Sequence, residues 1–307
     1  MTQPRACVAT LTYRRPEGLR AIVQALRPQL ADVPRSRLLI VDNDLVPSAK
    51  EAFQEVVGDD PRITYVHEPR PGIAAARNRA LDEAGDDDLL VFIDDDEVPS
   101  EQWLRSLLHA WRATGAAAVV GPVVSVFGEQ SDPWIADGAF FTRLRHRTGT
   151  SLTTAATNNL LLDLHQLAPF GLRFDEGFST SGGSDTVFTR QLVAAGGRMV
   201  WCDEALVFDM VPPERASREW VRSRALRLGN SDSRAAVYLA PSGRRWSARL
   251  RATRRGALRL VAGGCRISLG VLLGSSLHRA RGTRMMMRGL GMLRGAWGSF
   301  VDEYARS

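Results

Sequence analysis

The chain has 307 residues, 44% of them hydrophobic, and a formal net charge of +6. This composition supports a core and excludes an intrinsically disordered protein, and the length allows one large domain or two modest ones. The three cysteines, Cys7, Cys202 and Cys265, are odd in number and far apart, which favours reduced thiols over a disulfide framework or a zinc site. The N-terminal segment lacks an apolar stretch after a basic start, so we expect no secretory signal and a cytoplasmic protein.

The positive charge is concentrated in the C-terminal third of the chain. Residues 212–307 hold 20 arginines and five acidic residues, so the part before them is acidic overall. Lys50 is the one lysine in the sequence. Such use of arginine is typical of GC-rich coding, and we do not interpret it as phosphate recognition. We therefore expect no nucleic-acid partner.

Short apolar runs alternate with amphipathic segments over the first part of the chain. The apolar runs predict strands over 7–13, 38–44, 63–68, 89–95 and 117–127. The segments between them predict helices over 17–30, 48–57, 72–84 and 100–114, the last with Ser100 as its N-cap. This alternation is typical of βαβ units and a parallel sheet. Ligands of such sheets bind beyond the carboxyl ends of the strands, where several of these runs end in polar residues.

The second half begins less regularly. Residues 128–150 suggest a surface excursion, and the segments after it predict a strand over 156–164, a glycine- and serine-rich loop over 174–185, a helix over 185–197, a strand–turn–strand unit over 198–211 and a helix over 213–229. From about Arg244 the chain is both basic and apolar, but Arg259 and Arg266 interrupt the apolar stretch, which disfavours a spanning helix. Amphipathic helices on an anionic membrane surface fit this pattern, and a helical pair packed on the rest of the protein is the alternative.

The stretch "LLVFIDDDEVP", residues 89–99, places three aspartates and a glutamate directly after an apolar strand. On an extended chain, Asp94 and Asp96 share one face and Asp95 points away. Such a DxD pair can hold Mg²⁺ or Mn²⁺ through carboxylate oxygens and so clamp a diphosphate. The alternative is an acidic turn that favours the start of the next helix, a role that suits Glu97.

Asp42, in "VDND", follows another apolar strand and is expected at the same sheet edge. Its carboxylate can accept from a base N–H or a ribose hydroxyl, or it can close an Asx turn. The sequence contains no Walker A, GxGxxG, HExxH or CxxC motif. Kinase-like, dinucleotide-dependent and zinc-protease chemistry therefore lose support.

Six ordered segments resemble the family 2 inverting glycosyltransferases of the GT-A fold over about residues 5–230: "VATLTYRRPEGLRAIVQAL", "LLIVDND", "PGIAAARNRAL", "LLVFIDDDEVPSEQWL", "TNNLLL" and "FDEGFSTSGGSDTVFTRQLVAAGGRMVWCDEALVFDMVPPER". The resemblance implies an α/β domain over 1–230, Rossmann-like, with a mostly parallel central sheet and flanking helices. A helical, basic, amphipathic extension over 231–307 follows it. The implied enzyme moves a sugar from a nucleotide-diphosphate sugar to an acceptor hydroxyl with inversion, using Mn²⁺ or Mg²⁺.

The resemblance also implies a role for individual residues. Asp185 takes the position of the catalytic base, although it could equally cap the helix that follows it. The implied nucleotide contacts are Thr10, Thr12, Tyr13, Arg14, Asp42, Asp44, Arg77, Asp94 and Asp95. The implied metal ligands are Asp96, Asp94 and Asp209. The implied sugar and acceptor contacts are Trp134, Asn158, Asn159, Gly183 and Ser184.

Two positions depart from the family pattern, and one assignment has a strong alternative. Ser184 stands where the family usually has a glutamate before the base, so acceptor contacts differ there. Asp209 and Met210 stand where relatives often carry His or Glu, and Asp209 could simply cap a loop. Trp134 could stack on a sugar, but a large aromatic residue in a loop often belongs to a local core.

The expected partners follow from the same resemblance. They are a nucleotide-diphosphate sugar, an acceptor that is a cell-envelope or lipid-linked glycan or a small molecule, and an anionic membrane surface at the inner face of the plasma membrane. A sugar-phosphate nucleotidyltransferase is one alternative, but "LTYRRPEG" lacks the glycines of its N-terminal loop. A non-catalytic nucleotide-sugar binding protein is another, and the joint presence of Asp94, Asp96 and Asp185 argues against it.

Overall fold

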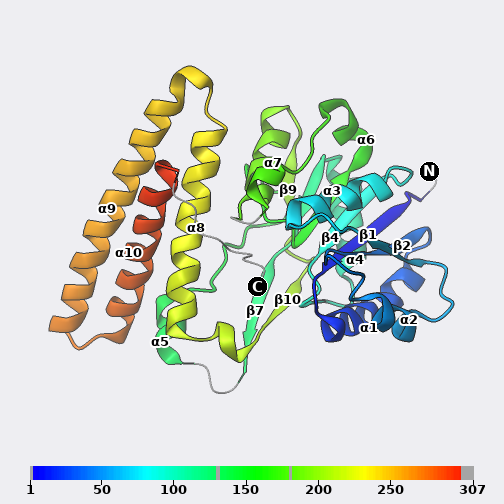
Figure 1. Ribbon diagram of the computed structural model, residues 1–307, viewed down its shortest axis with the longest axis horizontal. Helices are drawn as coiled ribbons and strands as arrows, with labels where there is room; N and C mark the ends of the chain where they lie inside the picture. Colours follow the sequence, from blue (N-terminus) through cyan, green and yellow to red (C-terminus); the bar gives the residue numbers. More distant parts are fainter. Residues whose placement is uncertain (1–2, 129–131, 180–181, 299–307) are drawn as a thin grey trace. The chain divides into compact units, whose positions relative to one another are not determined.

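The computed structural model describes residues 3–128, 132–179 and 182–298 (Figure 1). Its strands are β1 (Ala6–Thr12), β2 (Ser36–Asp42), β3 (Ile63–His67), β4 (Leu89–Ile93), β5 (Glu97–Pro99), β6 (Ala118–Val120), β7 (Val123–Phe127), β8 (Asn159–Asp163), β9 (Met199–Trp201) and β10 (Val207–Val211). Its α-helices are α1 (Pro16–Asp32), α2 (Lys50–Val57), α3 (Ile73–Glu83), α4 (Trp103–Thr114), α5 (Pro133–Gly138), α6 (Leu164–Leu167), α7 (Ser184–Ala194), α8 (Arg218–Tyr238), α9 (Arg245–Leu272) and α10 (Ser276–Ala296). Single-turn 3₁₀ helices cover Ala168–Phe170, Glu176–Phe178, Pro213–Arg215 and Ser242–Arg244.

A seven-stranded sheet with the order β3-β2-β1-β4-β8-β6-β9 forms the centre of the α/β part. Its neighbouring strands are parallel except where β8 meets β4 and β6. The register aligns Thr12 with Asp42 and Asp42 with His67, so β1, β2 and β3 end at the same edge of the sheet. The expected α/β architecture, with a mostly parallel central sheet, is confirmed.

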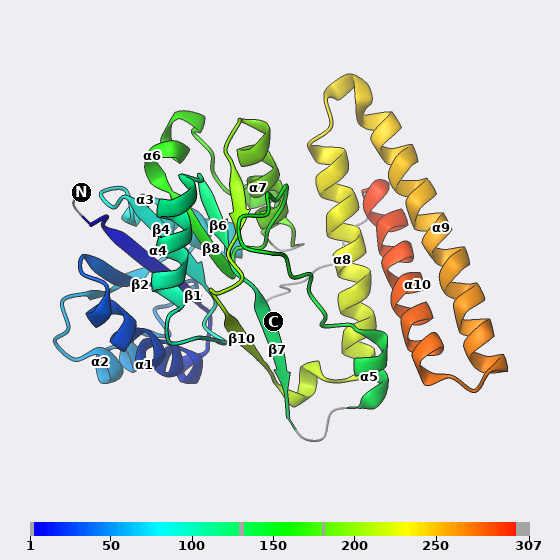
Figure 2. The same ribbon diagram turned by 180° about the vertical axis from the view of Figure 1, so that it is seen from behind.

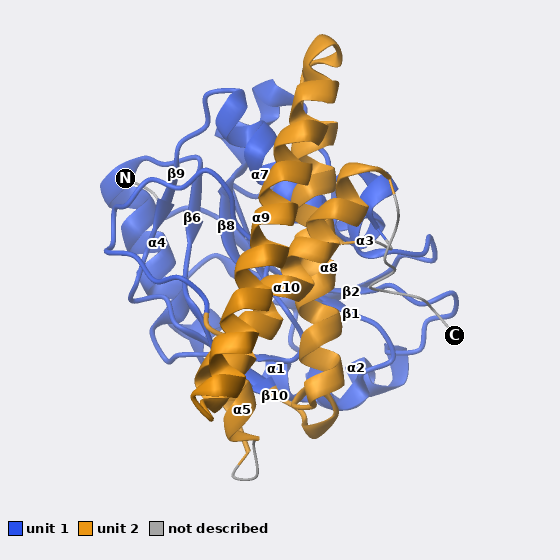
Figure 3. Ribbon diagram, turned by 90° about the vertical axis from the view of Figure 1, so that its left-hand side faces the viewer, with its two compact units in different colours: residues 1–124, 143–179, 184–210 blue, residues 125–142, 180–183, 211–307 orange. Residues whose placement is uncertain are grey.

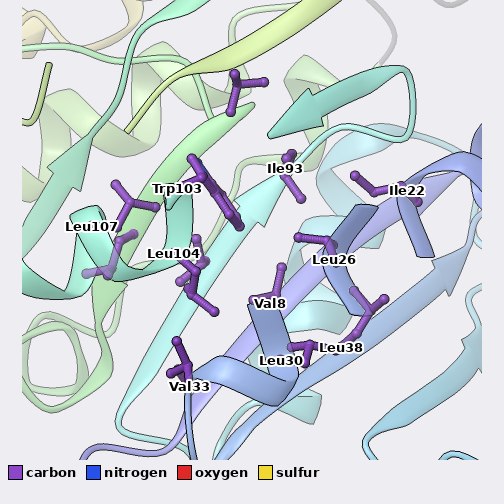
Figure 4. Packing of buried hydrophobic residues seen from close by; sticks show 14 of the residues in the cluster. Val8, Ile22, Leu26, Leu30, Val33, Leu38, Ile93, Trp103, Leu104 and Leu107 are labelled. Atoms are coloured by element: carbon purple, nitrogen blue, oxygen red, sulfur yellow. The ribbon is translucent and has the colours of Figure 1, made fainter. Parts of the chain in front are cut away.

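Both faces of this sheet are buried, which explains why its strands are unbroken apolar runs in the sequence. Successive residues of β1 belong to different clusters, because side chains alternate between the faces of a strand. Helices α1 and α4 cover one face with side chains such as Ile22, Leu26 and Trp103 (Figure 4). Helices α3 and α7 contribute residues such as Ala76 and Phe188 to the other cluster.

The apolar run expected as one strand over 117–127 is two strands in different sheets. Gly121 and Pro122 separate β6 from β7. A Cβ atom on Gly121 would collide with the Ala205 carbonyl and the Asn159 side chain, and Pro122 has no N–H to donate to a ladder. Strand β7 joins a three-stranded sheet with the order β5-β10-β7.

The helix after the acidic stretch begins later than expected. Residues 97–99 form strand β5, and Gln102 is the N-cap of α4. The N–H of Ser100 donates to the carbonyl of Leu206, so neither Ser100 nor Glu97 starts the helix. Likewise, α8 begins at Arg218 rather than at 213, because the Ser217 side chain accepts from the Trp220 N–H and caps it there.

The chain forms two compact units (Figure 3). The first comprises residues 1–124, 143–179 and 184–210 and contains the seven-stranded sheet. The second comprises residues 125–142, 180–183 and 211–307 and contains α5, α8, α9 and α10. Residue 230, the boundary expected from the sequence, lies inside α8.

In the second unit, α10 lies between α8 and α9 (Figures 1 and 2). Glycines allow this close approach: a Cβ atom on Gly263 would lie 2.8 Å from the carbonyl oxygen of Gly282, and one on Gly256 would lie 2.8 Å from that of Gly289. An aromatic cluster that includes Trp134 and Phe141 packs against α8 and α10. Within the described residues, no helix is both long and apolar enough to cross a bilayer.

Candidate active site

The carboxyl ends of β2 and β3 hold a fully buried carboxylate. Asp42 accepts from the Tyr65 hydroxyl at 2.7 Å, from the Ala49 N–H at 2.8 Å and from the Asp44 N–H at 3.3 Å. The last of these bonds is the Asx turn that the sequence left as an alternative. Burial and the Asp42 carboxylate raise the pKa of Tyr65. Through these hydrogen bonds, Asp42 stabilises the loop after β2 in the ligand-free protein.

The residues just after β1 pair with this loop. Arg14 Nε lies 2.9 Å from Asp44 Oδ2, and the Arg14 guanidinium lies over the Tyr13 ring. Burial alone would raise the pKa of Asp44, but hydrogen bonds from Arg14 and the Leu45 N–H lower it overall. Thr10 is fully buried, and its hydroxyl has no hydrogen-bond partner among the described residues.

The acidic stretch leaves the strand and forms a turn, so the expected alternation of its aspartates ends at Ile93. Residues 95 and 96 are both in the turn, and Arg15 Nη1 lies 2.9 Å from a carboxylate oxygen of each. The strand pattern predicted that Asp95 points away from Asp96. This prediction is wrong, because both carboxylates contact the same guanidinium. The start of α1 is close to this turn, because a Cβ atom on Gly18 would lie 2.6 Å from the Asp95 carbonyl oxygen.

Three carboxylates of this stretch retain protons more readily than ordinary carboxylates do. Burial and the neighbouring Asp96 raise the pKa of Asp94 to about 7, although Arg77 opposes the shift. Burial and Asp94 raise the pKa of Glu97 well above its usual range, although Arg143 opposes this shift. Burial raises the pKa of Asp95 too, against Arg15 and the hydroxyl of Thr12. Burial is the largest cause of all three shifts, and the closeness of the carboxylates adds to them.

Asn158 and Asp209 border the acidic turn. The Asn158 amide donates to Glu97 at 2.6 Å. Asp209 is directly opposite Glu97 in the β10–β5 pair and forms an ion pair with Arg143 at 3.2 Å. Within the described residues, no three His, Cys, Asp or Glu side chains are grouped closely enough to hold a metal ion. Asp94, Asp96 and Asp209 are therefore not a preassembled set of three ligands.

The residues present nevertheless fit a hard divalent cation that binds through few protein ligands. Carboxylate oxygens are the donors that Mg²⁺ and Mn²⁺ prefer. The side chain of Asp96 is 28% exposed at the turn, and its carboxylate is close enough to Asp94 to add to the effect of burial on the pKa of Asp94. Asp96 and Asp94 would hold such an ion.

A buried arginine connects the acidic turn with the start of α7. Arg77 donates from Nη1 to the Ser184 hydroxyl at 2.7 Å, and its charge acts on Asp94. Asp185, the next residue, is half-buried in the first turn of α7, and its Oδ1 accepts from the Thr186 N–H. Among the described residues, no arginine, lysine or histidine forms an ion pair with Asp185, whereas Asp44, Asp95, Asp96 and Asp209 each have an arginine partner.

Other residues assigned to sugar or acceptor binding have contacts within the fold. The Asn159 amide nitrogen donates to the carbonyls of Pro122 and Ala205, and its oxygen accepts from Trp103 Nε1. Trp134, in the second unit, is buried against Phe140 and has the guanidinium groups of Arg218 and Arg222 over its ring. Asn159 and Trp134 thus have structural roles. For Trp134, this agrees with the alternative that the residue belongs to a local core. Gly183, with φ of +98°, also belongs to the second unit and directly precedes α7.

Comparison with known proteins gives a consistent result. The sequence model described as "Glycosyl transferase family 2" matches residues 7–166, more than half of the chain. The succinoglycan biosynthesis protein ExoM of Rhizobium meliloti (strain 1021) is 36% identical over 228 residues, which are 74% of each chain. The chain belongs to glycosyl transferase family 2.

Two further similarities extend this result. The succinoglycan biosynthesis protein ExoA of the same organism is 30% identical over 103 residues, 33% of this chain and 31% of its own. The mannosyltransferase PcManGT from Pyrobaculum calidifontis, solved in complex with GDP-Man and Mn²⁺, has a TM-score of 0.61 and 17% identity over 97% of this chain and 88% of that one. At this low identity, the structural likeness concerns the fold alone.

As a family 2 glycosyltransferase, the protein is an enzyme that uses a nucleotide-sugar donor. The matched segment contains β1 from Cys7 onward, Arg77, the acidic turn and both asparagines, whereas Asp185 and Asp209 lie beyond it. The roles expected for these two residues therefore stay predictions.

Sequence reasoning did not single out two cations of this glycosyltransferase. Arg15 and Arg143 contact the acidic turn or the residue opposite it. Arg15 follows the strand that was assigned to nucleotide binding, so its position was a usable signal. Arg143 is in the segment 128–150, which looked like a surface excursion, and no local pattern pointed from it to Asp209.

Proposed function

We propose that this glycosyltransferase is metal-dependent and inverting, and that Asp185 is its catalytic base. The observation that carries the proposal is the Arg77–Ser184 hydrogen bond, because Arg77 also acts on Asp94. One buried guanidinium thus connects the carboxylates assigned to the donor's diphosphate with the residue before Asp185. A single displacement needs a base on the face of the sugar opposite the leaving group, and this arrangement supports it.

Asp185 suits the role of base because it has no cationic partner among the described residues. An acceptor hydroxyl is a poor nucleophile at neutral pH, and a carboxylate within hydrogen-bond reach takes its proton during attack. A carboxylate held in an ion pair with arginine would be a weaker base. Oδ1 of Asp185 accepts from the Thr186 N–H at 2.7 Å, which restrains the orientation of the carboxylate.

The remaining residues bind the donor and stabilise the leaving group. Thr10, Thr12, Tyr13, Arg14, Asp42, Asp44, Arg77 and Asp95 surround the nucleotide in this proposal. A Mn²⁺ or Mg²⁺ ion held by Asp96 and Asp94 supplies positive charge beside the departing diphosphate. Asp209 stays paired with Arg143 or joins these ligands, and Asn158 and Ser184 contact the sugar or the acceptor.

The acceptor is a cell-envelope or lipid-linked glycan, with a small molecule as the variant. The name of ExoM, a succinoglycan biosynthesis protein, supports a polysaccharide precursor. We further propose that the enzyme works at the cytoplasmic face of the plasma membrane and binds anionic lipid through its arginine-rich C-terminal region.

Asp185→Asn tests the assignment of the base. The substitution keeps the size of the side chain and removes its basicity, so turnover should fall about 10²- to 10⁴-fold. Calorimetric titration should show unchanged binding of the nucleotide diphosphate with Mn²⁺. Asp59→Asn is the matched control, because Asp59 is an exposed carboxylate outside the site.

The assay follows transfer from a panel of nucleotide sugars, with Mn²⁺ or with chelator, and assigns the anomeric configuration of the product by NMR. Full activity of the Asp185→Asn enzyme would remove Asp185 as the base, and a retained configuration would refute inversion. Release of pyrophosphate from a nucleoside triphosphate and a sugar phosphate would identify a nucleotidyltransferase instead.

A further inference from the structure

Helix α9 has an exposed apolar stripe along its entire length. Leu250, Leu258, Val261, Leu269 and Leu272 recur at helical spacing and fall within one arc of the helix. Val261 is 67% exposed and Leu272 is 82% exposed. The glycines that face α10 are on the opposite side of α9, so α10 leaves the stripe uncovered.

Exposed arginines lie next to the apolar stripe on α9. Arg251, Arg254 and Arg255 are exposed on or beside the same arc. Among the described residues, none of the three pairs with a carboxylate, and Arg251 donates only to the Ser247 hydroxyl. Helices α9 and α10 together contain twelve arginines and no acidic residue. We call the stripe and these three arginines the outer face of α9.

The turn that ends α9 continues the apolar surface. Val271, Leu272 and Leu273 are consecutive and exposed, and Leu273 is 63% exposed. At the other end of the hairpin, Trp246 is 60% exposed and packs edge-to-face with Trp297. Aromatic residues of this kind favour the boundary between lipid and water.

We propose that the outer face of α9 docks the enzyme on an anionic bilayer, with the helix lying in the plane of the interface and the side chains of residues 271–273 inserted. This inference deepens the proposed membrane association by naming the surface and its orientation. Aliphatic side chains beside unpaired arginines suit acyl chains beside negatively charged headgroups. A second copy of the chain is a poorer partner, because two such faces would bring their arginines together without compensating charge.

Vesicle sedimentation with the full-length protein tests the proposal. Phosphatidylcholine vesicles with phosphatidylglycerol should bind it, and vesicles of phosphatidylcholine alone should bind it weakly. The double variant Arg251→Gln/Arg255→Gln should lose affinity for anionic vesicles about fivefold per arginine. Arg112→Gln/Arg147→Gln removes the same charge from exposed sites outside α9 and should bind like the wild type.

A second pair of variants tests the apolar stripe. Leu258→Ser/Val261→Ser should lower the affinity about tenfold, because two aliphatic side chains no longer enter the bilayer. Leu144→Ser is the control, since Leu144 is 79% exposed but not on α9. All of these variants should keep their fold, by circular dichroism, and their turnover with a water-soluble acceptor.

The native thiols give a direct readout of orientation. Cys265 is exposed within the stripe, whereas Cys7 and Cys202 are buried. An environment-sensitive fluorophore on Cys265 should shift to the blue when anionic vesicles are added. The same label on Cys265→Ser/Arg112→Cys should not shift on bound protein.

The outcomes distinguish membrane association itself from its assignment to the outer face of α9. Failure of the wild type to bind anionic vesicles would refute the proposed membrane association altogether. Binding that survives in the stripe and arginine variants, or without a shift at Cys265, would overturn the assignment to the outer face of α9. Dimerisation that Leu258→Ser/Val261→Ser abolishes, without vesicle binding, would assign the face to a second copy. None of these results bears on Asp185.

Discussion

Carboxylates crowd the turn after β4, and their mutual repulsion has a thermodynamic cost in the ligand-free protein. Arg15 forms ion pairs with Asp95 and Asp96. Burial raises the pKa values of Asp94 and Glu97, and a nearby carboxylate adds to each shift: Asp96 for Asp94, and Asp94 for Glu97. A cation bound at this turn, as proposed above, would offset this negative charge. In the ligand-free protein, the cost should be visible as a dependence of stability on pH.

The Asp94 carboxyl predicts the sign of that dependence. Its pKa is about 7 in the folded protein against an ordinary 3.8, so its stabilising contribution is complete below about pH 4 and is lost as the pH rises through 7. The metal-free enzyme should be less stable at pH 8 than at pH 6. Asp94→Asn should reduce this slope, leaving the part due to Glu97, and stabilise the protein at pH 8 by up to about 4 kcal/mol.

Urea unfolding at both pH values, with chelator present, measures the effect. Asp59→Asn is the control, and it should leave the slope unchanged because Asp59 is exposed. A steeper loss of stability in the Asp94→Asn protein at high pH would contradict the raised pKa.

At the scale of elements, the glycines of α9 and α10 decide how closely the helices pack. Gly256, Gly263 and Gly270 recur every seven residues on the side of α9 that faces α10. The neighbouring Gly264 is different, since a Cβ atom there would meet nothing within 4 Å. These adjacent glycines allow a matched comparison within one helix.

Gly263→Ala should destabilise the protein by about 1–3 kcal/mol. The new Cβ would lie 2.8 Å from both the Gly282 carbonyl oxygen and the Met286 nitrogen, and backbone atoms can yield only if the helices separate. Gly264→Ala should instead stabilise by up to about 1 kcal/mol, because alanine is the better helix former. Urea unfolding of both variants tests the difference, and equal effects would show that α9 and α10 do not pack closely at Gly263.

Elements could be predicted from the sequence where local pattern and burial agree. The strands around β1 were recognisable because both faces are buried, and the acidic turn was located because it follows β4 directly. The split between β6 and β7 had a local signal in Gly121 and Pro122, but the partner strands were not evident from it. The pairs of Arg15 with Asp95 and of Arg143 with Asp209 join residues far apart in the sequence, and no local periodicity encodes them.

At the scale of the whole molecule, charge is divided along the chain. The part before residue 212 is acidic overall, and the α9–α10 hairpin carries twelve arginines without an acidic residue. Half-buried arginines add to the cost, because partial burial lowers the pKa values of Arg284 and Arg288. Such self-repulsion destabilises a folded region, and dissolved salt screens it.

The backbone amides of the α9–α10 hairpin should therefore be better protected from hydrogen exchange in moderate salt than in very dilute buffer. The Debye length, over which charges act on one another, falls from about 30 Å at 0.01 M to about 10 Å at 0.1 M ionic strength. The repulsion among the arginines is therefore weaker in salt. Hydrogen exchange of the amides of residues 245–296 should slow on addition of KCl, and the gain should be smaller in Arg251→Gln/Arg255→Gln. Arg112→Gln/Arg147→Gln should keep the full gain, because those arginines are in the acidic part of the chain. Faster exchange of the hairpin in KCl would contradict the repulsion argument, and anionic vesicles should protect the hairpin as salt does, since they supply the missing negative charge.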